Sequence, residues 1–424
     1  MIEAIRNAFR IPDLRKKILF TLAIIALYRV GAHIPVPGVD PVAVKELVTG
    51  AGSALGLLNL FAGGALENFA LLALGIMPYI TATIIMQLLQ AVIPTIERWS
   101  KEGEAGQRKI TQTARYMTLG IALMESIGLL TVFQAPAPQG LGVELDWLTR
   151  IVIVISLIAG TAAIMWMGEL ITQRGIGNGM SLIIFVSIVS QMPASFMAVY
   201  RTSSPLQFAV VMLMFLLMTA GIIFVDQGQR RIPIQFSKRV RGRRVLGGQS
   251  TYIPLKVNTA GVIPIIFASS MLYLPAMFVT AIPSSGFFGA IRNWINNNLV
   301  NARSWWYVAL YGLLIVFFTY FYTAIQFDPA RQPDMIQRQG GFVPGIRPGS
   351  ATTQYLQHII SRITLPGSLF LAFVAVLPSI VAIIWGVNLG FSGVSILIVV
   401  GVALETMKQI ESQLMMRNYE GFLT

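Results

Sequence analysis

Ten long apolar runs constrain this chain more than any other feature of its sequence. A helix needs about 20 mostly apolar residues to cross the hydrocarbon core of a bilayer. Runs of this kind lie near residues 18–36, 69–93, 116–134, 148–170, 179–199, 206–226, 258–281, 305–327, 366–386 and 392–411. Only 12% of the 424 residues are charged, about half the share typical of a soluble domain. We therefore expect an all-α polytopic membrane protein with ten transmembrane helices.

The positive charges favour one orientation of these ten spans. If the N-terminus is cytoplasmic, the inner segments hold 25 Lys and Arg residues and the outer segments hold five. The remaining one of 31, Arg29, falls near the outer end of the first span, where its side chain can reach the interface. This split follows the positive-inside rule, so both termini are predicted to be cytoplasmic. Most of the net charge of +13 is then explained by topology.

Little in the sequence supports catalysis. There is no Cys, and the two His residues, His33 and His358, are far apart. No phosphate-binding loop or nucleophile elbow is present, so we expect no cofactor, no metal site and no enzyme activity. Four acidic residues lie in or beside spans: Glu125, Glu169, Asp226 and Glu405. An ion-coupled carrier or lipid flippase stays the alternative, and neutralising Glu125 and Glu405 would distinguish it from a channel.

A short motif repeats at matching places in two halves of the chain. The second run contains GIMPYI at 75–80 and the seventh contains GVIPII at 261–266, both G-x-x-P-x-I. Five spans per half make the halves inverted repeats, a pattern that points to the functional site in transporter-like folds. We expect halves at 18–205 and 206–411, flanked by cytoplasmic segments 1–17 and 412–424. Pro78 and Pro264 should kink their helices and mark a moving seam, although a chance match of short apolar motifs is the alternative.

Two further sequence features favour a channel over a carrier. The apolar, glycine-rich segment at 50–64 is too short to span, and it predicts a short helix or re-entrant segment rather than an ordinary outer loop. Ile80 with Ile84, and Ile184 with Ile188, lie one helical turn apart and could form an aliphatic constriction. Packing against lipid is the simpler explanation for that spacing.

Two inner loops carry more charge and glycine than topology requires. Residues 227–257 include seven clustered Lys and Arg residues, and residues 328–365 hold six Gly and Pro residues around Arg347. Such loops favour docking of a large partner, with anionic lipid or simple topology as alternatives.

Six motifs together resemble one family, the bacterial SecY channel subunits. They are FALLALGIMPYI at 69–80, RGIGNG at 174–179, GRRV at 242–245 with QST at 249–251, KVNTAGVIP at 256–264, GFVPGIRPG at 341–349 and RNYE at 417–420. The likeness covers nearly the whole chain. Ser350 departs from it, because many relatives carry an acid there.

The resemblance implies a clamshell of two inverted pseudo-symmetric halves, with a lateral gate between spans two and seven. It implies a protein-conducting channel in the bacterial plasma membrane that passes unfolded secretory polypeptides and releases signal segments into lipid. The implied pore ring is Ile80, Ile84, Ile184, Ile188, Ile266 and Ile398. The implied plug, near 52–66, includes Leu57, Leu58, Asn59, Leu60 and Phe61. The implied docking residues are Arg243, Arg244, Arg347 and Tyr419.

The same resemblance implies the partners. These are the membrane subunits SecE and SecG, the motor ATPase SecA, the ribosome, signal peptides with nascent polypeptides, and membrane lipids. Energy for transport would come from the motor or the ribosome.

Overall fold

The structure is a computed structural model. It describes residues 9–39, 44–45, 48, 54–134, 146–236, 239–241, 244–246, 250–281, 286–301, 304–326, 341–386 and 391–420. The first half contains α2 (Pro12–Gly31), α4 (Ala54–Ala62), α5 (Met77–Val92), α6 (Pro94–Lys101), α7 (Glu104–Gln134), α8 (Trp147–Arg174) and α9 (Gly179–Thr202). The second half contains α10 (Pro205–Gln227), α11 (Ile263–Ala281), α12 (Gly286–Ile295), a π-helical turn (Asn296–Val300), α13 (Trp305–Gln326), α15 (Ser350–Trp385) and α16 (Gly393–Glu420).

Every predicted apolar run contains a helix. Seven helices in the described residues are long and apolar enough to cross a membrane: α7, α8, α9, α10, α13, α15 and α16. The other three runs hold α2, α5 and α11. The α2 helix includes the basic residues Arg15, Lys16 and Lys17, whereas α5 is only 16 residues long and bends sharply into α6. The fold is thus a polytopic helical membrane protein, consistent with ten spans.

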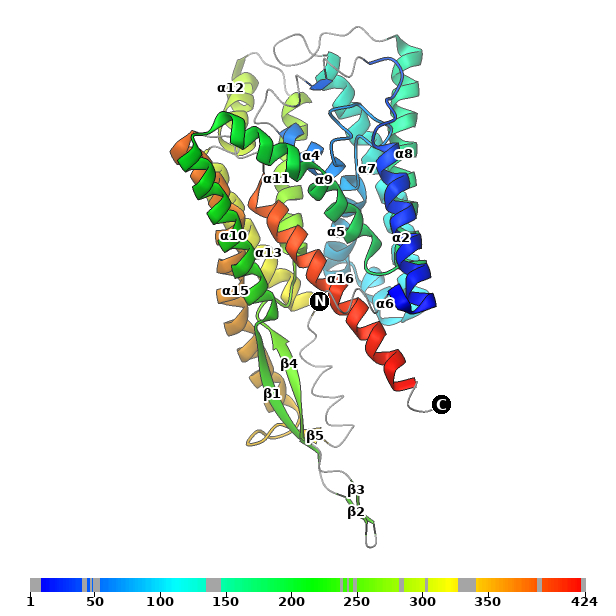
Figure 1. Cartoon of the computed structure of the whole chain (residues 1–424), viewed down its shortest axis with the longest axis vertical. Coiled ribbons are helices and arrows are strands. Elements are labelled where there is room, and N and C mark those ends of the chain that lie inside the picture. The colour runs from blue at the N-terminus through cyan, green and yellow to red at the C-terminus, as the bar shows by residue number, and fades with distance from the viewer. Residues whose placement is uncertain are drawn as a thin grey trace.

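The helices run roughly along the long axis of the molecule and connect at two ends (Figure 1). A β-hairpin arm, α6 and the end of α16 lie at one end, whereas α12 and the start of α8 lie at the other. The second end carries exposed tryptophans at helix termini, namely Trp147, Trp294, Trp305 and Trp306. Tryptophans of this kind anchor helices at a membrane interface, so they indicate where the bilayer ends.

The prediction of kinks at the two prolines is wrong in its geometry. Pro78 and Pro264 are the second residues of α5 and α11, where a missing N–H removes no helical hydrogen bond. The runs are interrupted just before them, because residues 71–76 and 261–262 are turns. Gly75 and Gly261 end these turns with positive φ angles of 61° and 66°. The repeated motif is therefore a left-handed glycine followed by a proline-started helix, in both halves.

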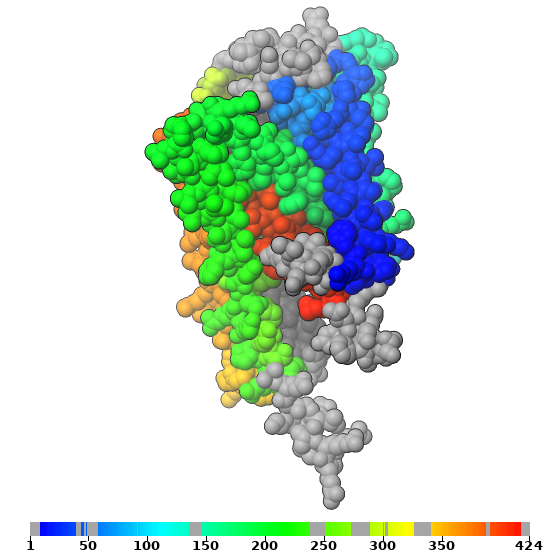
Figure 2. Space-filling view, viewed as in Figure 1, coloured from blue at the N-terminus to red at the C-terminus, as the bar shows by residue number. Residues whose placement is uncertain are grey.

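The two halves meet along two seams. On one side α11 of the second half packs against α5 and α7, and on the other α9 packs against α10 and α16. Only Ser203 and Ser204 separate α9 from α10. Ser204 caps α10 in a reciprocal bond with Gln207, which fixes this short corner. Figure 2 shows α10 along one face of the molecule. The exposed apolar side chains of this helix include Leu213, Leu217 and Phe224.

The basic loop at 227–257 forms strands. The strands β1 (Gln229–Phe236), β4 (Ser250–Lys256) and β5 (Gly341–Phe342) make an antiparallel sheet, and β2 (Arg239–Arg241) pairs with β3 (Arg244–Leu246). Buried Ile232 and Leu255 pack with Val343, Leu356 and Ile359, so this arm has its own small core with the start of α15. The described parts of the two long loops of the second half thereby pack together at the end of the molecule that carries the β-hairpin arm, which we call the basic end.

Candidate functional site

The six predicted pore-ring isoleucines are buried in one hydrophobic cluster. They come from α5, α9, α11 and α16, and none is more than 8% exposed. Ile80 and Ile266 occupy equivalent places, because their N–H groups bond to the carbonyls of Ile76 and Val262 in the first turn after each glycine. Lipid-facing isoleucines would be exposed, so packing against lipid does not explain these residues. Both halves contribute to this cluster.

The residues of α9 give the order of these features along the helix. Ser181 lines a cavity, and Ile184 and Ile188 belong to the hydrophobic cluster. Gln191 contacts α4, and Ser190 contacts Arg29, which itself bonds to Gly63 just after α4. Ten residues of helix cover about 15 Å. The isoleucines therefore lie between a cavity at the basic end and α4 toward the opposite end.

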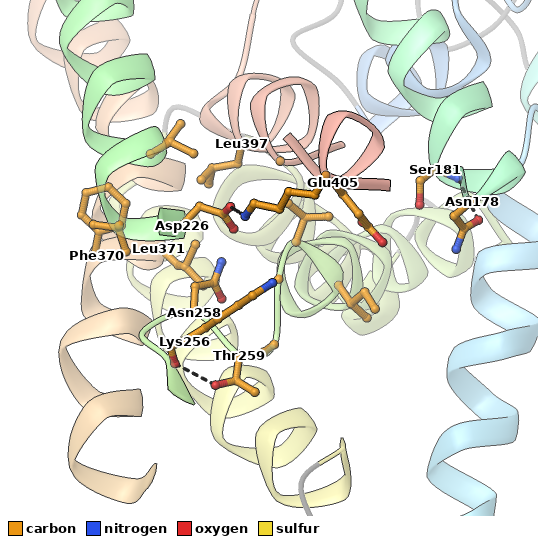
Figure 3. A pocket seen from close by; sticks show the side chains of 18 residues that line it. Asn178, Ser181, Asp226, Lys256, Asn258, Thr259, Phe370, Leu371, Leu397 and Glu405 are labelled. Atoms are coloured by element: carbon orange, nitrogen blue, oxygen red, sulfur yellow. Dashed lines mark hydrogen bonds and ion pairs between the residues drawn. The ribbon is translucent and has the colours of Figure 1, made fainter. Parts of the chain in front are cut away.

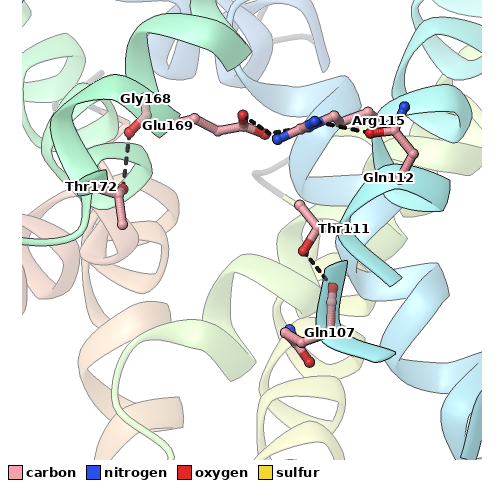
Figure 4. Close-up of polar contacts among 7 residues, drawn as sticks. All are labelled: Gln107, Thr111, Gln112, Arg115, Gly168, Glu169 and Thr172. Atoms are coloured by element: carbon pink, nitrogen blue, oxygen red, sulfur yellow. Dashed lines mark hydrogen bonds and ion pairs between the residues drawn. The ribbon is translucent and has the colours of Figure 1, made fainter. Parts of the chain in front are cut away.

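The cavity holds about 410 Å³ and opens between the halves. Its lining includes Ile80, Ile184 and Ile266 together with polar groups at the helix ends. Arg115 of α7 forms a two-bond ion pair with Glu169 of α8 in its wall, with N–O distances of 2.8 and 2.6 Å (Figure 4). This pair ties α7 to α8 beside the hydrophobic cluster.

A second cavity of about 250 Å³ adjoins the first and shares Asn178 and Ser181 with it. Lys408 of α16 donates to Asp226 of α10 at 2.7 Å in its wall, and Glu405 lies nearby (Figure 3). Acidic and basic side chains line both cavities. The two cavities together form a polar vestibule beside the hydrophobic cluster that contains the six isoleucines.

The predicted plug segment contains the short helix α4, which packs against α5 and α9. Leu58, Asn59, Leu60 and Phe61 are buried there, and their apolar members join the same cluster as the isoleucines. Leu57 lies in α4, but its side chain falls outside the described residues. The prediction of a short non-spanning helix is confirmed for residues 54–62.

The predicted docking residues are only partly described. Arg347 is exposed in the turn between β5 and α15. Arg243 lies outside the described residues, and only the backbones of Arg244 in β3 and Tyr419 in α16 are described.

Sequence reasoning missed the polar groups that hold α4. Arg29 was expected to extend to the interface, but it turns inward and donates to the carbonyl of Gly63 at 2.9 Å and to Ser190 Oγ at 3.0 Å. Tyr28 is fully buried, with its hydroxyl 2.6 Å from Ser187 Oγ. The signal was present, because Ser187, Ser190 and Gln191 interrupt an apolar run.

The acidic residues weighed for a carrier do not come together. Glu125 is buried in α7 but lines neither cavity, whereas Glu405 is exposed at the rim of the second. Among the described residues, no group of three or more His, Asp or Glu side chains could hold a metal ion.

Fold and site together define a class: a polytopic helical membrane protein whose two halves share one hydrophobic cluster, with polar cavities on one side of it and a short non-spanning helix on the other. Comparison with known proteins gives the family. A sequence model of the SecY family matches residues 70–407, and the chain belongs to that family.

Full-length relatives and solved structures agree. A protein translocase subunit SecY from Streptomyces galbus is 50% identical over 440 residues, and one from Corynebacterium glutamicum is 48% identical over 441, each covering 100% of both chains. The fold matches a solved structure of a protein-conducting channel, with a TM-score of 0.64 and 16% identity over 94% of this chain and 92% of the other. It also matches Sec61 from a canine ribosome-channel complex, with a TM-score of 0.60 and 15% identity over the same shares.

Proposed function

We propose that this chain is the protein-conducting channel subunit of a bacterial plasma-membrane translocase. It passes unfolded secretory polypeptides through the isoleucine ring and releases signal or transmembrane segments into lipid between α5 and α11. The observation that carries the proposal is the burial of six isoleucines from both halves between a polar vestibule and α4. An aliphatic ring can fit any side chain without binding it, and it excludes ions because stripping their water is costly.

The lateral gate is supported by the packing of α11 against α5 and α7. All three helices line or border the first cavity, and a segment in that cavity could reach lipid if the seam parted. An h-region of about ten Leu-class residues gains roughly 3–6 kcal/mol in lipid at the per-residue values of insertion scales. That gain is large enough to drive sideways exit.

The partners follow from the surfaces. The exposed apolar side chains of α10 suit lipid or a membrane subunit such as SecE, with SecG as a further subunit. The basic β-arm and exposed Arg347 suit an acidic surface on a motor ATPase, SecA, or on a ribosome. Either would supply the energy.

The segments 18–205 and 206–411 act as the two rigid halves of the channel, and both termini face the cytoplasm.

The experiment is uptake of a secretory precursor by inverted membrane vesicles whose own channel subunit is replaced by this chain. We expect uptake that needs ATP, the motor and an intact signal peptide, and that survives Glu125→Gln and Glu405→Gln. Uptake abolished by either neutralising change at normal protein level would favour an ion-coupled carrier. No uptake at normal protein level would refute the proposal.

A further inference from the structure

The last turn of α4 is held by side chains from two other helices. Gln191 of α9 donates to the carbonyl of Asn59 at 3.2 Å, and Arg29 of α2 donates to the carbonyl of Gly63 at 2.9 Å. The Tyr28 hydroxyl lies 3.3 Å from the carbonyl of Ala62. Three backbone carbonyls at the C-terminal end of α4 are therefore each within hydrogen-bond distance of a side chain from α2 or α9.

Helix ends explain why these contacts are favourable. The final carbonyls of a helix have no partner within it, and they carry the negative end of the helix dipole. A guanidinium that donates to such a carbonyl in a partly buried place makes a charge-assisted bond, which is stronger than a neutral one. Arg29 therefore stabilises α4 in its present place.

The backbone around this end leaves no spare room. A Cβ atom on Gly63 would lie 2.9 Å from the Cα of Ser187, and one on Gly75 would lie 2.9 Å from the Cα of Ala62. Gly63, Gly64 and Gly75 all have positive φ angles. The end of α4 is clamped between α9 and the turn before α5.

Two reciprocal hydrogen bonds join α4 to the loop that follows it. The Asn59 amide donates to Glu67 Oε1 at 2.7 Å, and the Glu67 N–H donates back to Asn59 Oδ1 at 3.2 Å. This pair ties the loop to α4, and the side-chain hydrogen bonds described above join the segment to α2 and α9.

The same helix carries both the latch and part of the ring. Gln191 of α9 contacts α4, and Ser187 and Ser190 of α9 contact Tyr28 and Arg29, while Ile184 and Ile188 belong to the hydrophobic cluster. A shift of α9 that separates the isoleucines also pulls these polar groups from α4.

We propose that Tyr28, Arg29 and Gln191 form a polar latch that positions the plug helix and couples its release to widening of the ring through α9. They are positioning residues, and the inference rests on the proposed function. The latch makes the closed state depend on α2, a helix that contributes no isoleucine to the ring.

The test uses a single-cysteine reporter, because the chain has no cysteine of its own. Leu60→Cys places a thiol in α4, and its reaction with a membrane-impermeant maleimide from the outer face is timed in membranes. Arg29→Met removes the donor at nearly constant length, Arg29→Lys keeps a cationic donor, and Tyr28→Phe removes one oxygen. Arg201→Met, in the exposed last turn of α9, is the matched control.

We expect Arg29→Met to speed labelling on the order of tenfold, the factor that corresponds to losing one charge-assisted bond. Tyr28→Phe should speed it less, and Arg29→Lys and Arg201→Met should leave it near the parent rate. Arg29→Met should also let a precursor with a defective signal peptide be exported. Labelling of Arg29→Met and Tyr28→Phe at the parent rate would overturn the latch.

Protein level in the membrane is measured for every variant. If Arg29→Met fails to accumulate in the membrane, the labelling rate of Tyr28→Phe decides the test, because that change removes a single oxygen atom. Labelling needs no transport, so a failure of the proposed function appears as absent precursor uptake by the parent, whereas a failure of the latch appears as unchanged labelling.

Discussion

At the scale of single residues, the environment decides the role of each side chain more than its type. Isoleucine is common in any membrane span, and the sequence alone could not separate buried isoleucines from lipid-facing ones. Ile184 is buried in the cluster between the halves, whereas Ile155 of α8 is 61% exposed. Arg29 was misjudged for the same reason, since its partners on α4 and α9 are far from it in sequence.

The ring should be sensitive to polarity. Ile184→Asn or Ile266→Asn places an amide in an apolar cluster, which costs about 1–3 kcal/mol where no partner is found. We expect ion leak in planar bilayers and export of precursors with defective signal peptides. Ile155→Asn is the matched control and should affect protein level only. A tight bilayer for both ring variants, at normal protein level, would place the constriction elsewhere.

Arg347 should act in docking and not in folding, because exposed charges contribute typically under about 1 kcal/mol to stability. Arg347→Ala is expected to reduce motor- or ribosome-driven transport strongly at normal protein level. Arg108→Ala, another exposed inner arginine, should leave transport unchanged. Binding of the soluble partner to membranes, measured beside uptake, separates the outcomes: a misfolded variant with intact partner binding would make Arg347 structural.

At the scale of elements, helix existence was predictable and helix boundaries were not. All ten apolar runs hold helices, but residues 71–76 form turns that include the left-handed Gly75, a backbone conformation that a hydropathy pattern cannot reveal. The motif G-x-x-P was read as a kink, whereas glycine ends a turn and proline starts the helix. The strands β1 and β4 were missed, because the segment 227–257 that holds them is rich in Lys and Arg and was interpreted as a docking loop.

Gly75 should be hard to replace. Gly75→Ala would strain a φ of 61° and press a Cβ atom against Ala62 of α4, so we expect a loss of at least about 1 kcal/mol in stability. Gly120→Ala, in the open middle of α7, meets nothing within 4 Å and should be neutral or stabilising. Thermal unfolding in detergent compares the two. Equal melting temperatures would show that the turn before α5 adapts freely.

The seam between α5 and α11 should open during export. Cysteine pairs with one member in 79–87 and the other in 263–270 can lock it, and the chain offers no competing thiol. We expect oxidation to stop export of signal-bearing precursors and reduction to restore it. A pair within one half, across α7 and α8, serves as control. Full export by a demonstrably locked seam would exclude α5 and α11 as the lateral gate.

At the scale of the whole molecule, a channel for polypeptides has to meet two conflicting requirements. A passage for polypeptides must be wide when used and sealed when idle. In the function we propose, the seal is divided between the isoleucines, which both halves supply, and α4, which only the first half supplies. The class of the protein could be predicted from spans, charge and motifs, but this division depends on contacts between distant segments.

The central claim is that polypeptides pass through the isoleucine ring, and one measurement tests it most directly. A precursor carrying one cysteine is arrested partway through membranes, and each ring position in turn, Ile80, Ile84, Ile184, Ile188, Ile266 or Ile398, is changed to Cys. We predict that the arrested chain forms disulfides with cysteines at all six ring positions, at nearly the same place along its length, and none with Ile155→Cys. Disulfides with Ile155→Cys and none with the ring would contradict the account.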